Sequence, residues 1–367
     1  MPTIKSVAVS AYSAPLEAPI TNGLYTYTAT QIVACRLELS NGISAIGWTH
    51  GEKIVFTAAE AIAAMLIGQE LNAERLWARM YQPKLFGRRG LEQRALSALD
   101  IAVWDGLGKE AGMSVHRLLG GFHDSVPAYK AGGYYGEGKS LEDLQREVSG
   151  HVEGGARALK MKIGAVSVAE DLARIDAVRT AIGPDVGLLV DVNNAYDRIT
   201  AEKMAAALDE RDIYWYEEPL SPDDLKGAAD LAGRTRTPVA SGENEYTLWG
   251  FRDLIDASAA DVINADAQIL GGITEWAKCA HYAQAKHIPV APHGDQEIHT
   301  QLVAAVPNGL IVEYYDNSLN RLKDVMFDQR LDLNADGSIT PFSTPGLGVE
   351  IQDQAVERYR VAHSVVC

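Results

Sequence analysis

The feature that most constrains the fold is a strand-helix unit that recurs from about residue 125, with a period in the twenties of residues. Several of the strand segments are apolar throughout, as strands buried on both faces of a sheet should be. Eight such units in about 200 residues predict a (β/α)8 barrel of the TIM type. The predicted strands are 126–131, 158–163, 187–192, 213–217, 238–241, 261–264, 288–291 and 310–313.

The residues before the barrel predict an α+β domain. Apolar segments at 31–39 and 43–48 flank Asn41-Gly42, a strong signal for a two-residue hairpin turn. Three helical segments follow, one near Thr57, one containing Leu76 and Met80, and one over 91–111. Strands followed by helices are typical of α+β architecture.

We therefore expect a capping domain over 1–125, a barrel with the functional site over 126–325, and a C-terminal return over 326–367 that packs on the capping domain. An open, doubly wound sheet is the rival fold, but no Gly-rich phosphate turn follows a strand. Among the barrel helices, Ser167 and Glu170 form the pattern of a capping box. Ser221-Pro222 also predicts a helix start.

Composition excludes several function classes. The net charge of −16 disfavours nucleic-acid binding, because phosphate contacts need clustered Lys and Arg. No apolar run is long enough for a signal peptide or a transmembrane helix, so we expect no membrane association. The three cysteines have no recognisable spacing, which fits a reducing cytoplasm better than a disulfide framework or a zinc site.

Three carboxylates end consecutive predicted strands. Asp191 ends the third strand, Glu217 the fourth and Glu243 the fifth. One such carboxylate alone is more often a helix cap or a solvated loop residue. Since active sites of these barrels lie at the carboxyl ends of the strands, the three are expected to converge and to repel one another unless a cation neutralises them. Oxygen ligands of this kind suit Mg²⁺, and also Mn²⁺.

Two lysines lie beside this triad. Lys160 and Lys162 alternate along the second strand, so both side chains point to the same face, the barrel interior. Mutual repulsion and a nearby metal are expected to lower the pKa of one of them, which makes it a candidate base. The alternative is that both lysines only form salt bridges with the carboxylates.

A second acid/base group is expected on the opposite side of the barrel. Asp266 and His293 end the sixth and seventh strands. A carboxylate beside a histidine fixes its tautomer and raises its basicity. A histidine with a purely structural role is the alternative. Glu313 ends the eighth strand.

These residues together resemble the enolase superfamily, in particular its mandelate racemase subgroup. The resemblance spans nearly the whole chain, and its most specific elements are the Lys160-x-Lys162-Ile-Gly motif and the strand-end residues described above. Muconate-cycloisomerase relatives have a lysine at the end of the sixth strand. Asp266 occupies this position here, which argues against that subgroup.

The resemblance implies roles for individual residues. Asp191, Glu217 and Glu243 would bind one Mg²⁺ per subunit. Lys162, with Lys160 beside it, would remove the proton α to a substrate carboxylate. His293, oriented by Asp266, would serve the other face of the substrate, and Glu313 would hydrogen-bond the substrate carboxylate. Relatives of this kind often form homo-oligomers, and the partner of the site would be a small carboxylic acid.

The fate of the resulting enediolate is open. Loss of a β-hydroxyl would make the protein a sugar-acid dehydratase, which we favour. Return of the proton would make it a racemase or epimerase, and departure of a ring or lactone oxygen a cycloisomerase. A Schiff-base aldolase that uses Lys160 or Lys162 would leave the three carboxylates unexplained. A non-catalytic binding protein that kept the barrel is a further alternative.

Substrate contacts are expected from loops, because loops on a rigid scaffold carry specificity. The segment 16–27, with Thr21 and Tyr25, and the turn 48–50, with His50, are predicted to close over the site. Tyr134, after the first barrel strand, and Asn193, after Asp191, are expected to line it.

Overall fold

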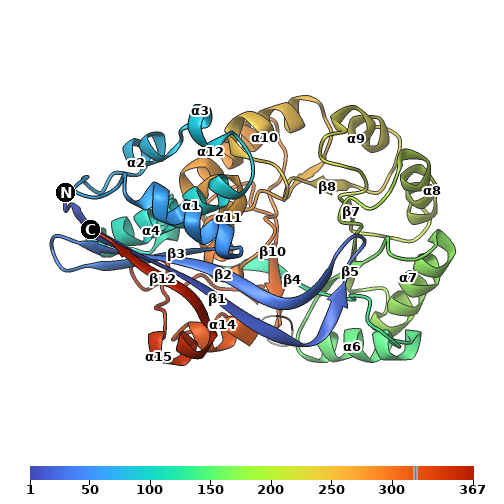
Figure 1. Ribbon diagram of the computed structural model, residues 1–367. Coiled ribbons are helices and arrows are strands. Elements are labelled where there is room, and N and C mark those ends of the chain that lie inside the picture. Colours follow the sequence, from blue (N-terminus) through green and yellow to red (C-terminus); the bar gives the residue numbers. More distant parts are fainter. Residues whose placement is uncertain (317–318, 320) are drawn as a thin grey trace.

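An antiparallel sheet forms the centre of the N-terminal part of the protein. The computed structural model describes residues 1–316, 319 and 321–367. The sheet has the order β12-β1-β2-β3. Its strands are β1 (Ile4–Thr21), β2 (Thr26–Leu39), β3 (Ser44–His50) and β12 (Arg360–Val366). Since β12 comes from the end of the chain and pairs antiparallel with β1, the C-terminal tail completes this sheet (Figure 1).

The predicted hairpin between β2 and β3 is present, with a longer turn than expected. Glu38 pairs with Ser44, so the turn covers residues 40–43. Gly42 has a φ of 88° and donates its amide hydrogen to the Leu39 carbonyl oxygen at 3.0 Å. This conformation favours glycine, which is why the Asn-Gly signal located the turn correctly.

The segment 16–27 is not the loop that we predicted. It forms the far end of a long β1–β2 hairpin, in which Ile20 pairs with Tyr27 and Thr21 with Thr26. The Asn22 side-chain oxygen accepts hydrogen bonds from the amides of Leu24 and Tyr25 and so closes the turn. Figure 1 shows this hairpin extending from the N-terminal sheet toward the barrel.

The predicted turn at 48–50 is likewise wrong, because these residues continue β3. Thr49 pairs with Val33, and His50 pairs with Ile32. Strand pairing therefore fixes the position of His50 more firmly than a loop would. The alternation that places successive side chains on opposite faces also explains why His50 and Trp48 point the same way.

Helices pack against one face of the antiparallel sheet and bury its apolar residues. Val7 and Val33 from the sheet share a core with Ile62 from α1 and Leu99 from α4. The longest helix, α4, has the predicted bounds and ends at Gly112 in the left-handed conformation. The helices are α1 (Lys53–Ala63), α2 (Ala73–Met80), α3 (Pro83–Phe86), α4 (Leu91–Ala111) and α5 (Val115–Leu118).

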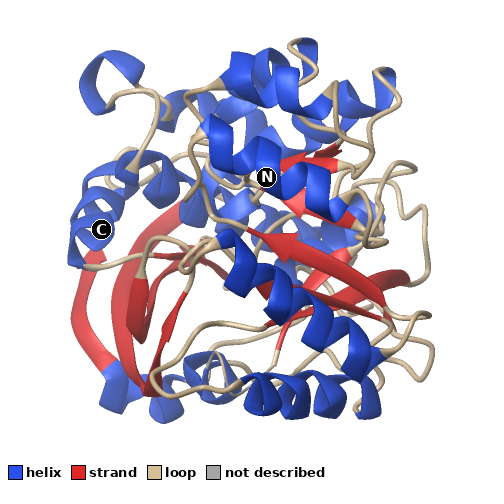
Figure 2. Ribbon diagram, turned by 90° about the vertical axis from the view of Figure 1, so that its right-hand side faces the viewer, coloured by secondary structure: helices blue, strands red, loops and turns tan. Residues whose placement is uncertain are grey.

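The second part of the chain forms the parallel barrel. Its strands follow one another around the ring in the order β10-β4-β5-β6-β7-β8-β9. Helices lie toward the outside, with strands between them (Figures 1 and 2). The strands are β4 (Val126–Gly132), β5 (Ala158–Lys162), β6 (Gly187–Asp191), β7 (Trp215–Glu217), β8 (Val239–Ser241), β9 (Val262–Ile263) and β10 (Val312–Tyr315).

The predicted seventh strand, 288–291, is reduced to a single point of pairing. Val290 forms parallel bridges with Ile263 on one side and with Gly309 on the other. These two bridges close the ring between β9 and the segment that leads into β10. The chain therefore follows the predicted path at 288–291, but it does so without a regular strand.

The helices of the barrel alternate with its strands. Among the described residues, no helix is long and apolar enough to cross a membrane.

The remaining elements include the short strand β11 (Ser338–Ile339), which pairs with β4. The helices are α6 (Leu141–Glu153), α7 (Val168–Ile182), α8 (Arg198–Leu208), α9 (Leu225–Ala232), α10 (Thr247–Asp256), α11 (Ala267–Leu270), α12 (Gly272–Ala285), α13 (Gln296–Val303), α14 (Arg321–Met326), α15 (Asp353–Val356) and the 3-10 turn η1 (Glu357–Tyr359).

The two predicted helix starts have different outcomes. The capping box of Ser167 and Glu170 opens α7 as expected. The helix expected at Ser221-Pro222 instead begins at Leu225, because the Asp224 side chain accepts the hydrogen bond from the Gly227 amide and acts as the cap.

Buried polar contacts attach α4 to the barrel. Asp100 on α4 accepts hydrogen bonds from the amide and the hydroxyl of Thr274 at 2.9 and 2.6 Å. On the neighbouring helix α2, Trp77 donates to the Gly271 carbonyl oxygen at 2.8 Å. Burial raises the pKa of Asp100 to about 7, so this contact is sensitive to pH.

We expect Asp100→Asn to remove one component of the dependence of stability on pH. Between pH 4 and 7 the folded chain holds a proton on Asp100 that the unfolded chain releases, so the free energy of unfolding falls as pH rises through this window. Asparagine can still accept the amide hydrogen of Thr274 with its side-chain oxygen and can donate its own amide hydrogen to the Thr274 hydroxyl oxygen, but it does not titrate. Denaturant unfolding at a series of pH values measures the difference, with exposed Asp230→Asn as control. Parallel curves for the wild type and Asp100→Asn would contradict the assignment.

Candidate active site

Strand register brings a lysine and two carboxylates side by side. In the parallel pairing of the barrel, Lys162 on β5 lies opposite Asp191 on β6, and Asp191 lies opposite Glu217 on β7. All three side chains are buried. The site therefore follows from the ends of the strands, which is where barrels of this type carry their functional groups.

Glu243 completes a cluster of three carboxylates. It follows the end of β8 by two residues, and one oxygen from each of Asp191, Glu217 and Glu243 lies within 4.8 Å of the other two. The Oε2 atom of Glu243 is buried and has no hydrogen-bond partner. Three converging carboxylates with an unsatisfied oxygen have the chemistry of a site for a hard divalent cation such as Mg²⁺.

The cluster changes the acidity of its own members. Burial raises the pKa of Glu217 to about 8, and Asp191, Glu243 and Glu313 add to this effect, while Lys160 opposes it. Burial alone would also raise the pKa of Asp191, but Lys162 and Lys160 lower it below its usual value. The lysines thus favour the ionised form of both carboxylates, and for Asp191 their effect outweighs that of burial.

Both lysines form ion pairs inside the barrel. Lys160 Nζ lies 2.9 Å from Glu217 Oε1 and 2.8 Å from Glu313 Oε1, with no exposed side-chain surface. Lys162 pairs with Asp191. Burial lowers the pKa of both lysines, but the surrounding carboxylates outweigh it, so both pKa values lie above the usual one. The lowered lysine pKa that we expected is therefore not found in the protein without a metal ion.

The lysines differ in their access to the site. Lys160 lies beneath the cavity described below, 5.3 Å from the centre of the Tyr129 ring. Lys162 lines the cavity and lies 5.5 Å from the centre of the Tyr134 ring. Lys162 can therefore reach a bound molecule, whereas Lys160 acts on the site through its carboxylate partners.

On the other side of the barrel, His293 lies against Asp266. The His293 Nδ1 and Asp266 Oδ2 atoms are 2.9 Å apart, and His293 Nε2 is 3.8 Å from Glu243 Oε2. Burial lowers the pKa of His293, but Glu243, Asp266 and Glu313 outweigh it and raise the pKa to about 10. Nε2 is thus the nitrogen that faces the carboxylate cluster, while Asp266 fixes the orientation of the ring through Nδ1.

Asp266 and Glu313 are both held in place from below the cavity. Asp266 Oδ1 accepts the amide hydrogen of Gln268 at 2.7 Å and so also caps α11. Glu313 Oε2 accepts the amide hydrogen of Gly294, the residue after His293, at 2.9 Å. Both carboxylates therefore help to fix the segment that carries His293.

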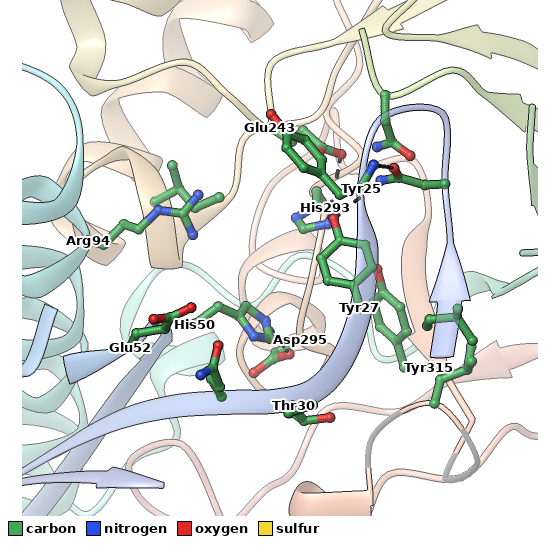
Figure 3. Close-up of a pocket in the computed structure, with 18 of the residues that line it drawn as sticks. Tyr25, Tyr27, Thr30, His50, Glu52, Arg94, Glu243, His293, Asp295 and Tyr315 are labelled. Carbon is green, nitrogen blue, oxygen red and sulfur yellow. Dashed lines mark hydrogen bonds and ion pairs between the residues drawn. The ribbon is translucent and has the colours of Figure 1, made fainter. Parts of the chain in front are cut away.

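A cavity of about 680 Å³ lies above these groups, between the barrel and the N-terminal part. Pockets of this size are typical of small-molecule sites. Figure 3 shows Glu243 and His293 in its wall, together with Tyr25 and Tyr27 from the β1–β2 hairpin. The predicted site residues that line it are Tyr25, His50, Tyr134, Lys162, Asn193, Glu243 and His293.

Thr21 is one predicted contact that is not part of the lining. Its hydroxyl is hydrogen-bonded to that of Thr26 at 2.8 Å, and its backbone pairs with Tyr135, whose amide donates to the Thr21 carbonyl oxygen at 2.9 Å. Thr21 therefore attaches the tip of the hairpin to the loop after β4. It thus positions Tyr25 and Tyr27 over the site.

His50 is held by a buried aspartate that the sequence did not reveal as a site residue. His50 Nε2 lies 3.2 Å from Asp295 Oδ1, and Asp295 also accepts a hydrogen bond from Trp48 at 2.6 Å. Lys323 pairs with the same carboxylate. Asp295 thus joins β3, α13 and α14 at the edge of the cavity.

Several further lining residues were missed. Tyr315 lies two residues after Glu313 on the same strand, so strand alternation could have predicted its inward direction. Glu52 and Arg94 come from the N-terminal helical region and meet the barrel only through tertiary packing. For these two residues the sequence alone carries no signal.

Family comparisons agree with the fold and the geometry of the site. The model for the mandelate racemase / muconate lactonizing enzyme N-terminal domain matches residues 4–120, and the model for the enolase C-terminal domain-like region matches residues 143–355. The chain therefore belongs to the mandelate racemase / muconate lactonizing enzyme family of the enolase superfamily. This confirms the resemblance and the barrel fold with its capping domain.

Three similar proteins illustrate the range of the family. Arabinonate dehydratase of Saccharolobus solfataricus is 35% identical, over 90% of this chain and 91% of its own. The 3,6-anhydro-alpha-L-galactonate cycloisomerase of Streptomyces coelicolor is 30% identical, over 98% of this chain and 99% of its own. The crystal structure of L-talarate dehydratase from Polaromonas sp. JS666, complexed with magnesium and L-glucarate, has a TM-score of 0.91 at 32% identity and covers 100% of this chain and 99% of that one.

We expect Glu243→Gln to abolish stabilisation of the fold by Mg²⁺. Glutamine should preserve the metal-free fold because Glu243 Oε2 has no hydrogen-bond partner there. A ligand present at about 100 times its Kd stabilises a fold by about 2.7 kcal/mol, which is enough to shift the Tm measurably. Thermal unfolding with Mg²⁺ and with EDTA measures the effect, with Glu245→Gln as the neighbouring control. An unchanged Mg²⁺ shift in Glu243→Gln would contradict this metal site.

Proposed function

We propose that this chain is an Mg²⁺-dependent enzyme that removes the proton α to a substrate carboxylate and then eliminates the β-hydroxyl, converting a sugar acid into a 2-keto-3-deoxy acid. The observation that carries the proposal is that Lys162 and His293, each with its own carboxylate partner, line one cavity together with Glu243. Two acid/base groups beside a cation site suit a two-proton reaction of a carboxylate.

In this reaction Lys162 is the base. Its side chain is placed by β5 and reaches the cavity, so its nitrogen can take the α-proton while the electron pair of the C–H bond moves into the carboxylate of the substrate. Asp191 orients the Lys162 nitrogen from one side, and the ring of Tyr134 limits its movement on the other. Lys160 balances the negative charge of Glu217 and Glu313 underneath.

His293 is the acid in the second half of the reaction. The electron pair returns from the carboxylate to form the C2–C3 double bond, and the C3 hydroxyl departs as water with the proton from His293 Nε2. The enol product then tautomerises to the 2-keto acid. Asp266 holds Nδ1, so that Nε2 is the nitrogen available to the substrate.

The three carboxylates fit a divalent cation by their donor chemistry and by the unsatisfied oxygen of Glu243. When bound by Asp191, Glu217 and Glu243, Mg²⁺ supplies positive charge that offsets the hold of Asp191 on the Lys162 ammonium group and stabilises the second negative charge on the substrate carboxylate. Glu313, which pairs with Lys160 beneath the cavity, would hydrogen-bond that carboxylate.

The comparisons support this reaction class. Two of the three similar proteins are dehydratases of sugar acids, and one of them was crystallised with magnesium and an acid sugar. The cycloisomerase matches this chain over an equally large share of its length, so ring opening or closure of a sugar-acid derivative is the second candidate. Both reactions begin with the same proton abstraction, and they differ in which oxygen leaves.

We expect Lys162→Ala and His293→Asn to separate the two halves of the reaction. Incubation with Mg²⁺ and a panel of aldonates and aldarates in D₂O allows α-proton exchange and 2-keto acid to be measured on the same samples. Lys162→Ala should abolish exchange. His293→Asn should retain exchange but form 2-keto acid about 10²- to 10⁴-fold more slowly, because it lacks the general acid.

The exposed substitutions Lys203→Ala and His281→Asn serve as matched controls and should behave as the wild type. Wild-type exchange that persists in Lys162→Ala would remove Lys162 as the base. Exchange by the wild-type protein without any 2-keto acid would contradict dehydration and favour racemisation or cycloisomerisation.

We also propose that the chain forms homo-oligomers, as its resemblance to this family implies. A partly exposed aromatic pair supports this proposal, because Trp249 is 46% exposed and stacks on Tyr81, and aromatic side chains are enriched at protein interfaces. Light scattering coupled to size-exclusion chromatography measures the assembled mass, and a mass of one chain would contradict the proposal.

A further inference from the structure

One cationic side chain in the cavity differs from the others. Lys162, His293 and His50 each lie against a carboxylate, as described above. Arg94 also lines the cavity, but among the described residues no carboxylate or carbonyl oxygen pairs with its guanidinium group. It is thus the one cation of the described lining that has no partner within the protein.

Rigid elements fix Arg94 relative to the reaction centre. Arg94 lies in the first turn of α4, next to buried Gln93, whose side-chain amide donates to the Leu270 carbonyl oxygen at 3.3 Å. One turn further along, the Ser97 hydroxyl accepts the amide hydrogen of Gly271 at 3.0 Å. Leu270 and Gly271 end α11, the helix that Asp266 caps. The spacing between Arg94 and the Asp266–His293 pair is therefore set by packed helices.

Figure 3 shows where Arg94 lies in the cavity. It is on the side formed by the N-terminal helices, together with Glu52, and is separated in the view from Glu243 and His293 in the barrel wall. The carboxylate of a substrate is expected next to the metal cluster, so Arg94 faces a more distant part of the same molecule.

We propose that Arg94 binds a second carboxylate at the far end of the substrate, so that the preferred substrates are dicarboxylic sugar acids, or aldarates. This assignment rests on the proposed function, which places the reacting carboxylate at Asp191, Glu217 and Glu243. Guanidinium remains charged at all accessible pH values, and its planar donors match a carboxylate in a bidentate manner. A carboxylate is thus the ligand group that best satisfies an unpaired arginine in a cavity.

Glu52 supplies the rival explanation. It lines the same part of the cavity, and no ion pair joins it to Arg94. The two side chains together could bind a terminal hydroxyl group, which would favour aldonates. However, Glu52 is exposed, and solvent and salt screen exposed charges. Its repulsion should therefore weaken, without cancelling, the attraction of Arg94 for an anion.

Calorimetric binding to matched acids tests the proposal. The probes are pairs of aldarate and aldonate with the same configuration, such as galactarate with galactonate and glucarate with gluconate, in the presence of Mg²⁺. The protein carries Lys162→Ala, so that bound acids are not consumed. We expect the aldarate of the best-bound pair to bind at least about 10-fold more tightly than its aldonate, since a charge-assisted hydrogen bond is about twice as strong as a neutral one.

Adding Arg94→Gln should weaken aldarate binding by about 10- to 100-fold and change aldonate binding less than about threefold. Arg88→Gln is the matched control, because Arg88 is exposed, lies six residues earlier and does not line the cavity. Glu52→Gln should tighten aldarate binding slightly. An equal loss for both acids, no loss for either, or no binding of any acid overturns the proposal.

Failure of the Arg94 assignment can be distinguished from failure of the proposed reaction. If the wild-type protein does not exchange the α-proton of an acid that it binds in D₂O, the proposed reaction fails. A preference for aldarates that disappears in Arg94→Gln would then still establish Arg94 as an anion-binding residue. Retained α-proton exchange with no effect of Arg94→Gln would instead overturn only the assignment of Arg94.

Discussion

The structure depends on the mutual neutralisation of lysines and carboxylates that are buried together at the carboxyl ends of the barrel strands. Lys160 lies between Glu217 and Glu313, and Lys162 lies against Asp191, with almost no exposed side-chain surface. Removing one member of such a cluster leaves an uncompensated charge, which typically costs about 3–5 kcal/mol. The same cluster provides the cation site and the candidate base, so stability and chemistry constrain the same residues.

The N-terminal sheet covers one side of the cavity above this charged end of the barrel. The β1–β2 hairpin is attached by the pairing of Thr21 with Tyr135, and its tyrosines form one wall. His50 on β3 is held by Asp295, which also accepts a hydrogen bond from Trp48. This part of the cavity wall is therefore fixed by strand pairing and buried polar contacts.

The sequence was most informative where periodicity and position in a strand determine the outcome. Apolar strands of regular spacing located the barrel, and the last residue of each strand located Asp191 and Glu217. It was least informative where tertiary contacts decide. Residues 16–27 contain Pro19, Asn22 and Gly23, which are typical of a loop, yet pairing with the adjacent strand extends β1 and β2. Arg94 reaches the cavity only because α4 packs on the barrel, which no local pattern indicates.

A crystal structure with Mn²⁺ in place of Mg²⁺ and a bound, unreacted sugar acid would show whether the buried charge cluster is the reaction centre. We expect an anomalous scattering peak among Asp191, Glu217 and Glu243, with one carboxylate of the acid next to it. We also expect Lys162 Nζ on one side of the α-carbon and His293 Nε2 on the other. A metal ion bound elsewhere, or an α-carbon that neither group can reach, would contradict the proposed reaction.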